Sequence, residues 1–189
     1  MLSDIFFHSD FKQVETDKER KVIIEEINMG EDDPADVCYD LIAEAVYGSH
    51  SLALPILGPK KNVNRFNGDD IRAFIDRFYR PDNLVVAVSG SLTTAQADAI
   101  VRKYMLPQLK TERSALAPIA HCDSAGSYRE RIKDFEQSNI AIAFPSIPFN
   151  HPDTMTQSAL NALLGGGMSS RLFQAIREQR GLAYSVYSS

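Results

Sequence analysis

Two glutamates near the amino-terminal end of the chain are spaced so that they can act together. Glu19 and Glu26 lie in a segment in which apolar residues recur at helical spacing. Seven residues are close to two helical turns, so both carboxylates project from nearly the same side, about 10 Å apart by rise. Carboxylates beside apolar residues must be desolvated or partnered, and a bound cation is one remedy. The alternative is that Lys18, Arg20 and Lys21 neutralise them on a solvated surface.

Arg177 and Tyr184 form a second candidate pair, seven residues apart and on either side of a helix stop at Gly181. Arginine supplies a permanent cation and tyrosine a phenolic donor. Such a pair can hold a carbonyl group or stabilise an oxyanion. The alternative is an ordinary surface arginine and a tyrosine in a sheet.

Three consecutive glycines, residues 165–167, precede a predicted helix start in the segment LGGGMSSRLF. A phosphate site is not favoured, because neither GxxxxGK[ST] nor a GxGxxG that follows a strand is present. A glycine backbone can instead approach an extended peptide closely. A plain corner between two helices is the alternative.

Composition and charge narrow the class of protein. The chain has 189 residues, of which 44% are apolar and 24% charged, so it can bury a core and is not a disordered protein. A net charge of −5 argues against nucleic acid as a partner. No apolar run approaches the roughly 20 residues that span a bilayer, and the opening MLSDIFFHSDF lacks the basic start of a signal peptide, so we expect a soluble chain.

The elements that must position these residues follow from apolar periodicity and capping residues. Helices are predicted near residues 15–29, 34–48, 67–79, 93–106, 153–164 and 169–179. Short apolar runs predict strands at 84–88, 139–145 and from 182 to 189, and residues 49–66 are expected to form an ordered loop. Residues 111–128, rich in Ser, Ala, Pro and Gly, are predicted to be a linker.

Several segments, taken in chain order, carry a resemblance to one family. They are ERKVIIEEI at 19–27, DDP at 32–34, HSLALPILG at 50–58, FYRPDN at 78–83, LGGGMSSRLFQ at 164–174 and RGLAY at 180–184. Together they closely resemble the pitrilysin/insulinase family of zinc metallopeptidases, in its bacterial processing-peptidase-like branch. The ordered set extends over most of the chain, on both sides of the predicted linker.

The resemblance implies roles for the residues singled out above. Glu26 resembles the third zinc ligand of the family, and Glu19 the second acid that supports the site. Arg177 and Tyr184 match the pair that holds substrate and the tetrahedral intermediate. Residues Gly165, Gly166 and Gly167 match a glycine-rich segment associated with substrate binding.

One part of the family pattern is missing from the chain. The inverted zinc motif HxxEH supplies two histidine ligands and a glutamate base in this family, and it does not occur here. A catalytic Zn²⁺ needs three protein ligands plus water. We therefore expect the motif upstream in a full-length parent, and we expect this chain alone to bind no zinc at that site and to be inactive.

The resemblance also implies the fold and its division. We expect an α+β fold with two related, incomplete α/β units in which mixed sheets pack against helices. The first unit would span residues 1–110 and the second residues 129–189, joined by the linker. Because such truncated units would expose strand edges and apolar helix faces, we also expect self-association.

The implied function is that of a zinc metalloendopeptidase acting on peptides or unfolded segments, in the bacterial cytoplasm or periplasm. A non-catalytic scaffold or partner subunit of the same family is one rival. That rival is less favoured because such subunits typically lose either the ligand glutamate or the Arg/Tyr pair. A peptide-binding module that uses an exposed sheet edge without chemistry is another rival.

Overall fold

A computed structural model of the chain describes residues 1–110, 122 and 126–189. Most of the predicted linker, residues 111–121 and 123–125, lies outside the described residues. By its internal contacts the chain divides into two units, Met1–Ile142 and Ala143–Ser189, and each is described by itself. The division predicted from the sequence, on either side of residues 111–128, stays a prediction.

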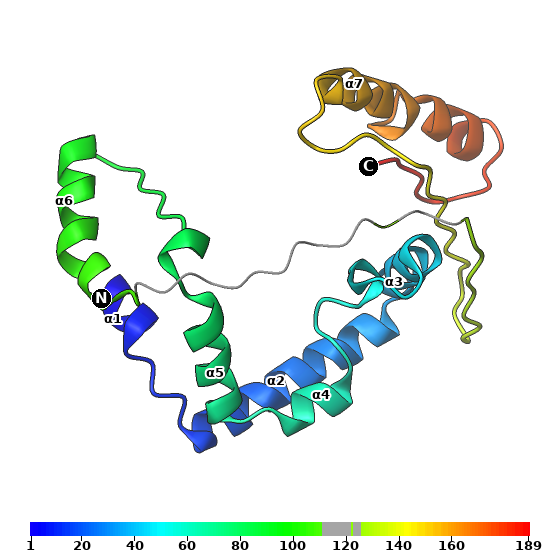
Figure 1. Ribbon diagram of the computed structural model, residues 1–189. Helices are drawn as coiled ribbons and strands as arrows, with labels where there is room; N and C mark the ends of the chain where they lie inside the picture. The colour runs from blue at the N-terminus through cyan, green and yellow to red at the C-terminus, as the bar shows by residue number, and fades with distance from the viewer. Residues whose placement is uncertain (111–121, 123–125) are drawn as a thin grey trace. The chain divides into compact units, whose positions relative to one another are not determined.

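The described elements are helices (Figure 1). Those of the first unit are α1 (Leu2–Phe7), α2 (Gln13–Asp32), α3 (Pro34–Tyr47), α4 (Lys60–Arg65), α5 (Gly68–Phe78) and α6 (Thr94–Tyr104), with 3-10 turns at Ser51–Ala53, Pro81–Asn83 and Leu106–Gln108. Those of the second unit are α7 (Thr154–Gly165) and a π-helical turn (Phe173–Glu178).

Local sequence signals set the helix boundaries. Asp33 caps α3, because its carboxylate accepts hydrogen bonds from the backbone N–H of Ala35 at 2.7 Å and of Asp36 at 3.3 Å. Asn67 caps α5 and Thr93 caps α6, each in a reciprocal capping box. The helices predicted at these positions are confirmed.

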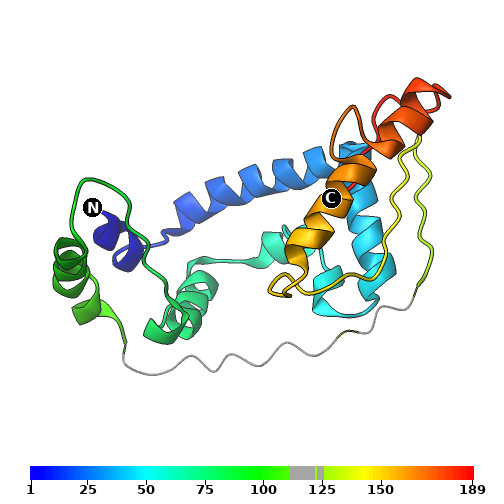
Figure 2. The same cartoon turned by 90° about the horizontal axis from the view of Figure 1, so that it is seen from above.

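The core of the first unit lies where α2, α3 and α4 pack together, as Figures 1 and 2 show. Ile27 of α2, Val37 and Ala45 of α3, and Val63 of α4 are its buried apolar residues. Burying an aliphatic side chain of this size contributes about 1.5–3 kcal/mol. This small core fixes the direction of α2, the helix that carries Glu19 and Glu26.

The predicted fold class, an α+β fold with mixed sheets, is wrong for the part of the chain that the structure describes. No strand occurs there, and the architecture is all-α. The segments 84–88, 139–145 and 182–189 were predicted as strands from apolar runs. A strand also requires a neighbouring main chain to pair with, and the first two segments make no main-chain hydrogen bond within the described residues.

The predicted loop at 49–66 is also partly helical. It contains the 3-10 turn Ser51–Ala53 and α4. Arg20 of α2 holds α4 in place, since its guanidinium donates to the backbone carbonyl oxygens of Val63, at 3.2 Å, and of Phe66. These contacts come from residues more than 40 positions apart, so no local sequence signal could reveal them.

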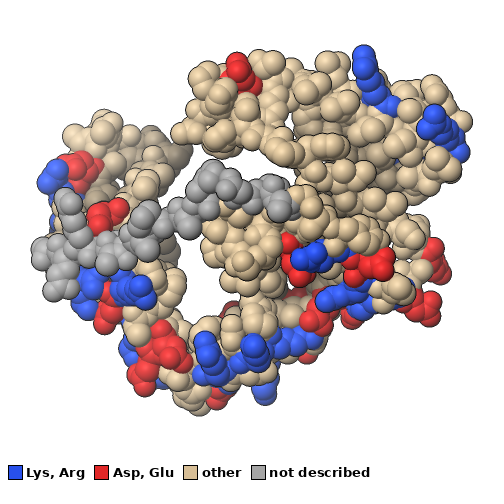
Figure 3. All heavy atoms as spheres, turned by 45° about the vertical axis from the view of Figure 1, so that its right-hand side comes forward, with Lys and Arg blue, Asp and Glu red and all other residues tan. Residues whose placement is uncertain are grey.

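Figure 3 shows basic and acidic side chains next to one another along part of the face drawn, while much of the rest of that face is uncharged. Lys60 pairs with Glu31 at 2.7 Å and Lys110 with Asp76 at 2.6 Å, and both pairs are exposed. Exposed pairs of this kind contribute about 0–1 kcal/mol each.

Among the described residues, no helix has the length and the apolar character that crossing a membrane requires.

Candidate functional site

Glu19 and Glu26 lie on α2 in the first unit, and both side chains are exposed. Neither carboxylate makes a hydrogen bond or ion pair with any residue that the structure describes. Their separation of two helical turns is the one that the sequence predicts. Two exposed carboxylates thus lie on one helix, and no basic side chain of the described residues forms an ion pair with either of them.

The basic residues that could have neutralised these carboxylates are engaged elsewhere. Lys18 pairs with Glu15 at 2.9 Å, and Arg20 pairs with Asp17 at 2.6 Å. Hydrogen bonds from Gln13 and from Arg20 lower the pKa of the Asp17 carboxyl, so this pair stays charged. The solvated-surface alternative therefore loses two of the three bases on which it depended.

Glu26 alone cannot form a metal centre. Within residues 1–110, 122 and 126–189, no three His, Cys, Asp or Glu side chains lie close enough together to hold a metal ion. A carboxylate oxygen is a suitable zinc ligand, and an exposed, unpaired one needs no rearrangement before it binds. The exposed Glu26 carboxylate could supply one ligand of a zinc site, and its role as that ligand stays a prediction.

Arg177 and Tyr184 are brought together in the second unit. The Cζ atom of Arg177 lies 5.1 Å from the centroid of the Tyr184 ring, within the range of a cation–π interaction. The chain reverses at Gly181, which has φ +59° and whose N–H donates to the carbonyl oxygen of Arg177 at 3.0 Å. The Tyr184 ring is 79% exposed, so its hydroxyl is open to a ligand.

Phe173 belongs to the same cluster, and sequence reasoning missed it. Its ring centroid lies 4.9 Å from Cζ of Arg177, four residues further along the chain. Helical residues four apart are neighbours on one face. The four-residue spacing of Phe173 and Arg177 is therefore the sequence signal for their contact. It is easily overlooked, because a phenylalanine in a predicted helix is usually assigned to the core.

The three glycines differ in their surroundings. A Cβ atom on Gly165 would lie 2.3 Å from the backbone nitrogen of Ser188, so only glycine allows this close approach. Gly166 is exposed but packs against the backbone of Ala162, whereas Gly167 has open space around it. Side-chain and backbone groups of Asn161 and Ser188 exchange hydrogen bonds of 3.1 and 3.2 Å beside Gly165.

Replacing Gly165 by alanine is expected to destabilise the second unit by about 1–3 kcal/mol, because the added methyl group overpacks against a backbone that must move. Thermal unfolding followed by circular dichroism measures the change. Gly167→Ala is the matched control and is expected to change stability by no more than about 0.5 kcal/mol. Equal effects of the two substitutions would contradict the close approach at Gly165.

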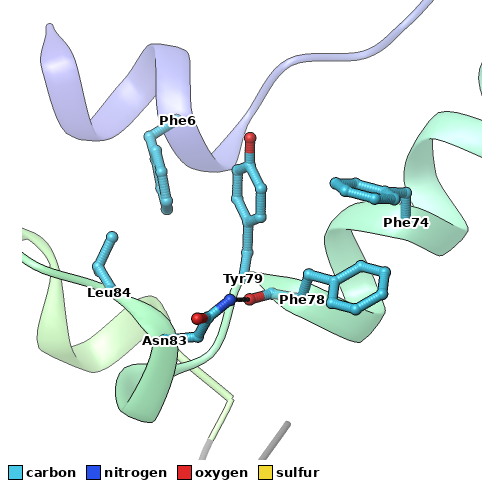
Figure 4. A pocket seen from close by; sticks show the side chains of 6 residues that line it. All are labelled: Phe6, Phe74, Phe78, Tyr79, Asn83 and Leu84. Atoms are coloured by element: carbon cyan, nitrogen blue, oxygen red, sulfur yellow. Dashed lines mark hydrogen bonds between the residues drawn. The ribbon is translucent and has the colours of Figure 1, made fainter. Parts of the chain in front are cut away.

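An aromatic groove of about 380 Å³ lies in the first unit between α1 and α5 (Figure 4). Phe6 stacks on Tyr79 with centroids 4.8 Å apart, and the amide of Asn83 donates to the carbonyl oxygen of Phe78 at 3.1 Å. The groove can contact an apolar side chain, and the described residues that line it include no aspartate, glutamate, histidine or lysine. Residues of the segment FYRPDN (78–83) line this groove, so we assign that segment a structural role.

A second pocket of about 370 Å³ has a mixed polar lining that includes Asp40, Glu44, His50 and Arg131. Burial raises the pKa of the Asp40 carboxyl, and the nearby charge of Asp36 adds to the effect. Neither Glu26 nor Glu19 lines this pocket, so it is separate from the predicted metal ligand. No local pattern in the sequence predicts this pocket, because its residues come from positions 37–55 and 131.

Comparison with known proteins covers the whole chain. Residues 1–60 match the family described as insulinase (peptidase family M16), and residues 65–189 match the peptidase M16 inactive domain. A protein of Bacillus subtilis named as an uncharacterized zinc protease is 39% identical over 189 residues, and another of Streptomyces coelicolor is 36% identical over 194. The chain is covered completely in both matches but spans only 45% and 42% of those relatives.

Solved structures agree with these sequence matches. A peptidase M16 inactive domain from Pseudomonas fluorescens aligns with 98% of this chain and 45% of its own, with a TM-score of 0.75 and 24% identity. A protease from Helicobacter pylori aligns with 99% of this chain and 46% of its own, with a TM-score of 0.78 and 20% identity. The resemblance expected from the motifs is confirmed: the chain belongs to peptidase family M16, the insulinase family.

Proposed function

We propose that these 189 residues are part of a zinc-dependent metalloendopeptidase that hydrolyses peptides or unfolded protein segments. The observation that carries the proposal is the match of the entire chain to relatives named zinc proteases. Those relatives are more than twice as long as the chain. In this proposal the complete protein is a longer chain that also contains an upstream HxxEH segment.

Glu26 is the third protein ligand of the zinc site in this proposal, beside two histidines of the HxxEH segment. Its exposed carboxylate, with no ion-pair partner among the described residues, supports that role. Glu19, two helical turns earlier, is the second acid that supports the site. Bound zinc lowers the pKa of a coordinated water and so supplies a nucleophile at neutral pH.

Arg177 and Tyr184 bind the substrate carbonyl group in this proposal. The guanidinium N–H groups and the phenolic O–H are donors that strengthen their hydrogen bonds as negative charge develops on the carbonyl oxygen. Their contact at 5.1 Å and the exposure of Tyr184 support the assignment. Residues 165–167 take part through the exposed backbone of Gly166 and Gly167, which an extended peptide can approach.

The two rival functions make different demands. A non-catalytic scaffold needs neither Glu26 nor the Arg177–Tyr184 pair, and all three residues are present. A peptide-binding module of the kind expected from the sequence needs an exposed sheet edge, and the described part of the chain has no strand. The peptidase therefore accounts for more of the observations than either rival.

Hydrolysis of an unfolded protein by the complete protein tests the proposal. Reduced and alkylated lactalbumin is expected to be cleaved internally, and a zinc chelator is expected to stop cleavage until Zn²⁺ is restored. The 189-residue chain alone is expected to leave the substrate intact, because it lacks two ligands and the general base. A complete protein that never cleaves would favour the scaffold or the binding module.

Self-association of the isolated chain is a separate expectation. Large apolar side chains such as Ile140, Ile142 and Phe144 are 84%, 75% and 81% exposed, respectively. Contiguous exposed apolar surface promotes association in water. Light scattering is expected to give a mass above 21.0 kDa that rises with concentration, and a monomer at every concentration would refute this.

A further inference from the structure

The guanidinium of Arg177 lies against two aromatic rings. Its Cζ atom is 4.9 Å from the centroid of Phe173 and 5.1 Å from that of Tyr184. Its Nε atom also lies 4.0 Å from a carboxylate oxygen of Glu178. The side chain nevertheless stays 39% exposed, so part of it remains free to contact a ligand.

The backbone around this cluster accounts for the arrangement. Phe173–Glu178 form a π-helical turn, with the N–H of Gln179 donating to the carbonyl oxygen of Gln174 at 3.0 Å. Such turns are rare in proteins as a whole, and those that occur are often found at functional sites. The chain then reverses, because the N–H of Leu182 donates to the carbonyl oxygen of Ile176 at 3.0 Å. This reversal returns Tyr184 to the side chain of Arg177.

Contact with a ring orients a guanidinium in a particular way. The group is planar and all of its N–H donors lie in that plane, so a ring that packs on its face leaves the donors available at the edge. Arginine has several rotatable bonds, and without such contacts its donors would sample many directions. A ring against the guanidinium therefore favours one direction for the donors before any substrate binds.

We propose that Phe173 is a positioning residue that holds the guanidinium of Arg177 ready for the substrate carbonyl group. This inference rests on the proposed function, in which Arg177 is a substrate-binding residue. Phe173 itself touches no reacting atom in this account. Its aromatic ring, rather than its bulk, is the property that matters, because an aliphatic side chain lacks the electron-rich face that attracts a cation.

The first test measures the reactivity of Arg177 in the 189-residue chain, without reference to catalysis. Phenylglyoxal modifies accessible guanidinium groups, and peptide mass spectrometry reports the rate at each arginine. Phe173→Leu is expected to raise the rate at Arg177 several-fold and to leave Arg171 and Arg180, both exposed, unchanged. Phe173→Trp is expected to keep the wild-type rate. An unchanged rate at Arg177 in Phe173→Leu would overturn the proposal.

The second test measures catalysis by the complete protein. Phe173→Leu is expected to lower kcat by about 10- to 100-fold, since misplaced groups lose catalytic effect, and Phe173→Trp is expected to restore most of it. The double variant Phe173→Leu/Arg177→Ala should be no slower than Arg177→Ala alone, because Phe173 acts only through Arg177. Additive losses, or no rescue by tryptophan, would assign Phe173 a merely structural role.

The two tests separate the two proposals. If the complete wild-type protein hydrolyses no peptide, the proposed function fails and the role of Phe173 in positioning Arg177 for catalysis fails with it, whatever the reactivity of Arg177. If the wild-type protein is active and the Phe173 variants match it in kcat, the proposed function stands and the positioning role fails. Phe149→Leu, at a ring that is 95% exposed in the same unit, is the matched control and is expected to change neither readout.

Discussion

Replacing Glu26 by alanine in the complete protein is expected to lower its affinity for zinc by at least about 100-fold and to abolish peptide hydrolysis. Loss of residues that merely orient zinc ligands already costs about 10- to 100-fold in affinity, and loss of a direct ligand must cost at least as much. Zinc content after dialysis, measured by mass spectrometry of the metal, checks the first effect. A peptide cleavage assay checks the second.

Glu25→Ala is the matched control for this experiment. Glu25 is an exposed carboxylate on the same helix, one position earlier, and therefore about 100° around the helix axis from Glu26. Its loss changes the net charge of α2 equally but removes no ligand. Full zinc content and activity in Glu26→Ala, or equal losses in both variants, would show that Glu26 is not the ligand.

Replacing Tyr184 by phenylalanine is expected to lower kcat by about 100- to 1,000-fold, the usual effect of removing one donor to an oxyanion. Arg177→Ala is expected to act at least as strongly, because it removes the cation and leaves the Tyr184 ring without its partner. Neither change touches a metal ligand, so the zinc content should stay the same. Steady-state kinetics with the complete protein measure the effect.

Tyr187→Phe is the matched control, because it removes a phenolic hydroxyl three residues away in the same unit. Tyr187 is 58% exposed, and its substitution is expected to leave kcat within about twofold, as most surface changes do. If Tyr184→Phe also has no effect on kcat but raises KM, the hydroxyl binds the ground state and the transition state equally. That result would remove Tyr184 from the group that stabilises the oxyanion.

The helices could be predicted because their signals are local. The helix predicted at 15–29 is observed as α2, Gln13–Asp32, and Asp33 caps α3 as its position before Pro34 suggests. The strands could not be predicted in the same way. An apolar run such as 139–145 indicates a preference for extended backbone, whereas a strand exists only if another main chain pairs with it, and the described residues offer no such partner.

Some features of the candidate site could likewise be predicted from local sequence, and others could not. Spacing alone brings Glu19 and Glu26 to one side of a helix, and a helix stop at Gly181 suggests a reversal of the chain. The contact of Phe173 with Arg177 and the approach of Ser188 to Gly165 depend on a π-helical turn and on tertiary packing. The four-residue spacing of Phe173 and Arg177 indicates that they can be neighbours, but no spacing in the sequence indicates the approach of Ser188 to Gly165.

Zinc stoichiometry tests whether Glu26 and an upstream HxxEH segment together form one zinc site. The 189-residue chain and the complete protein would be purified in parallel, dialysed without chelator and analysed for metal and for peptide hydrolysis. We expect close to no zinc and no hydrolysis for the chain, and about one zinc per molecule with chelator-sensitive hydrolysis for the complete protein. About one tightly held zinc in the chain alone, with peptidase activity that a chelator removes, would contradict it.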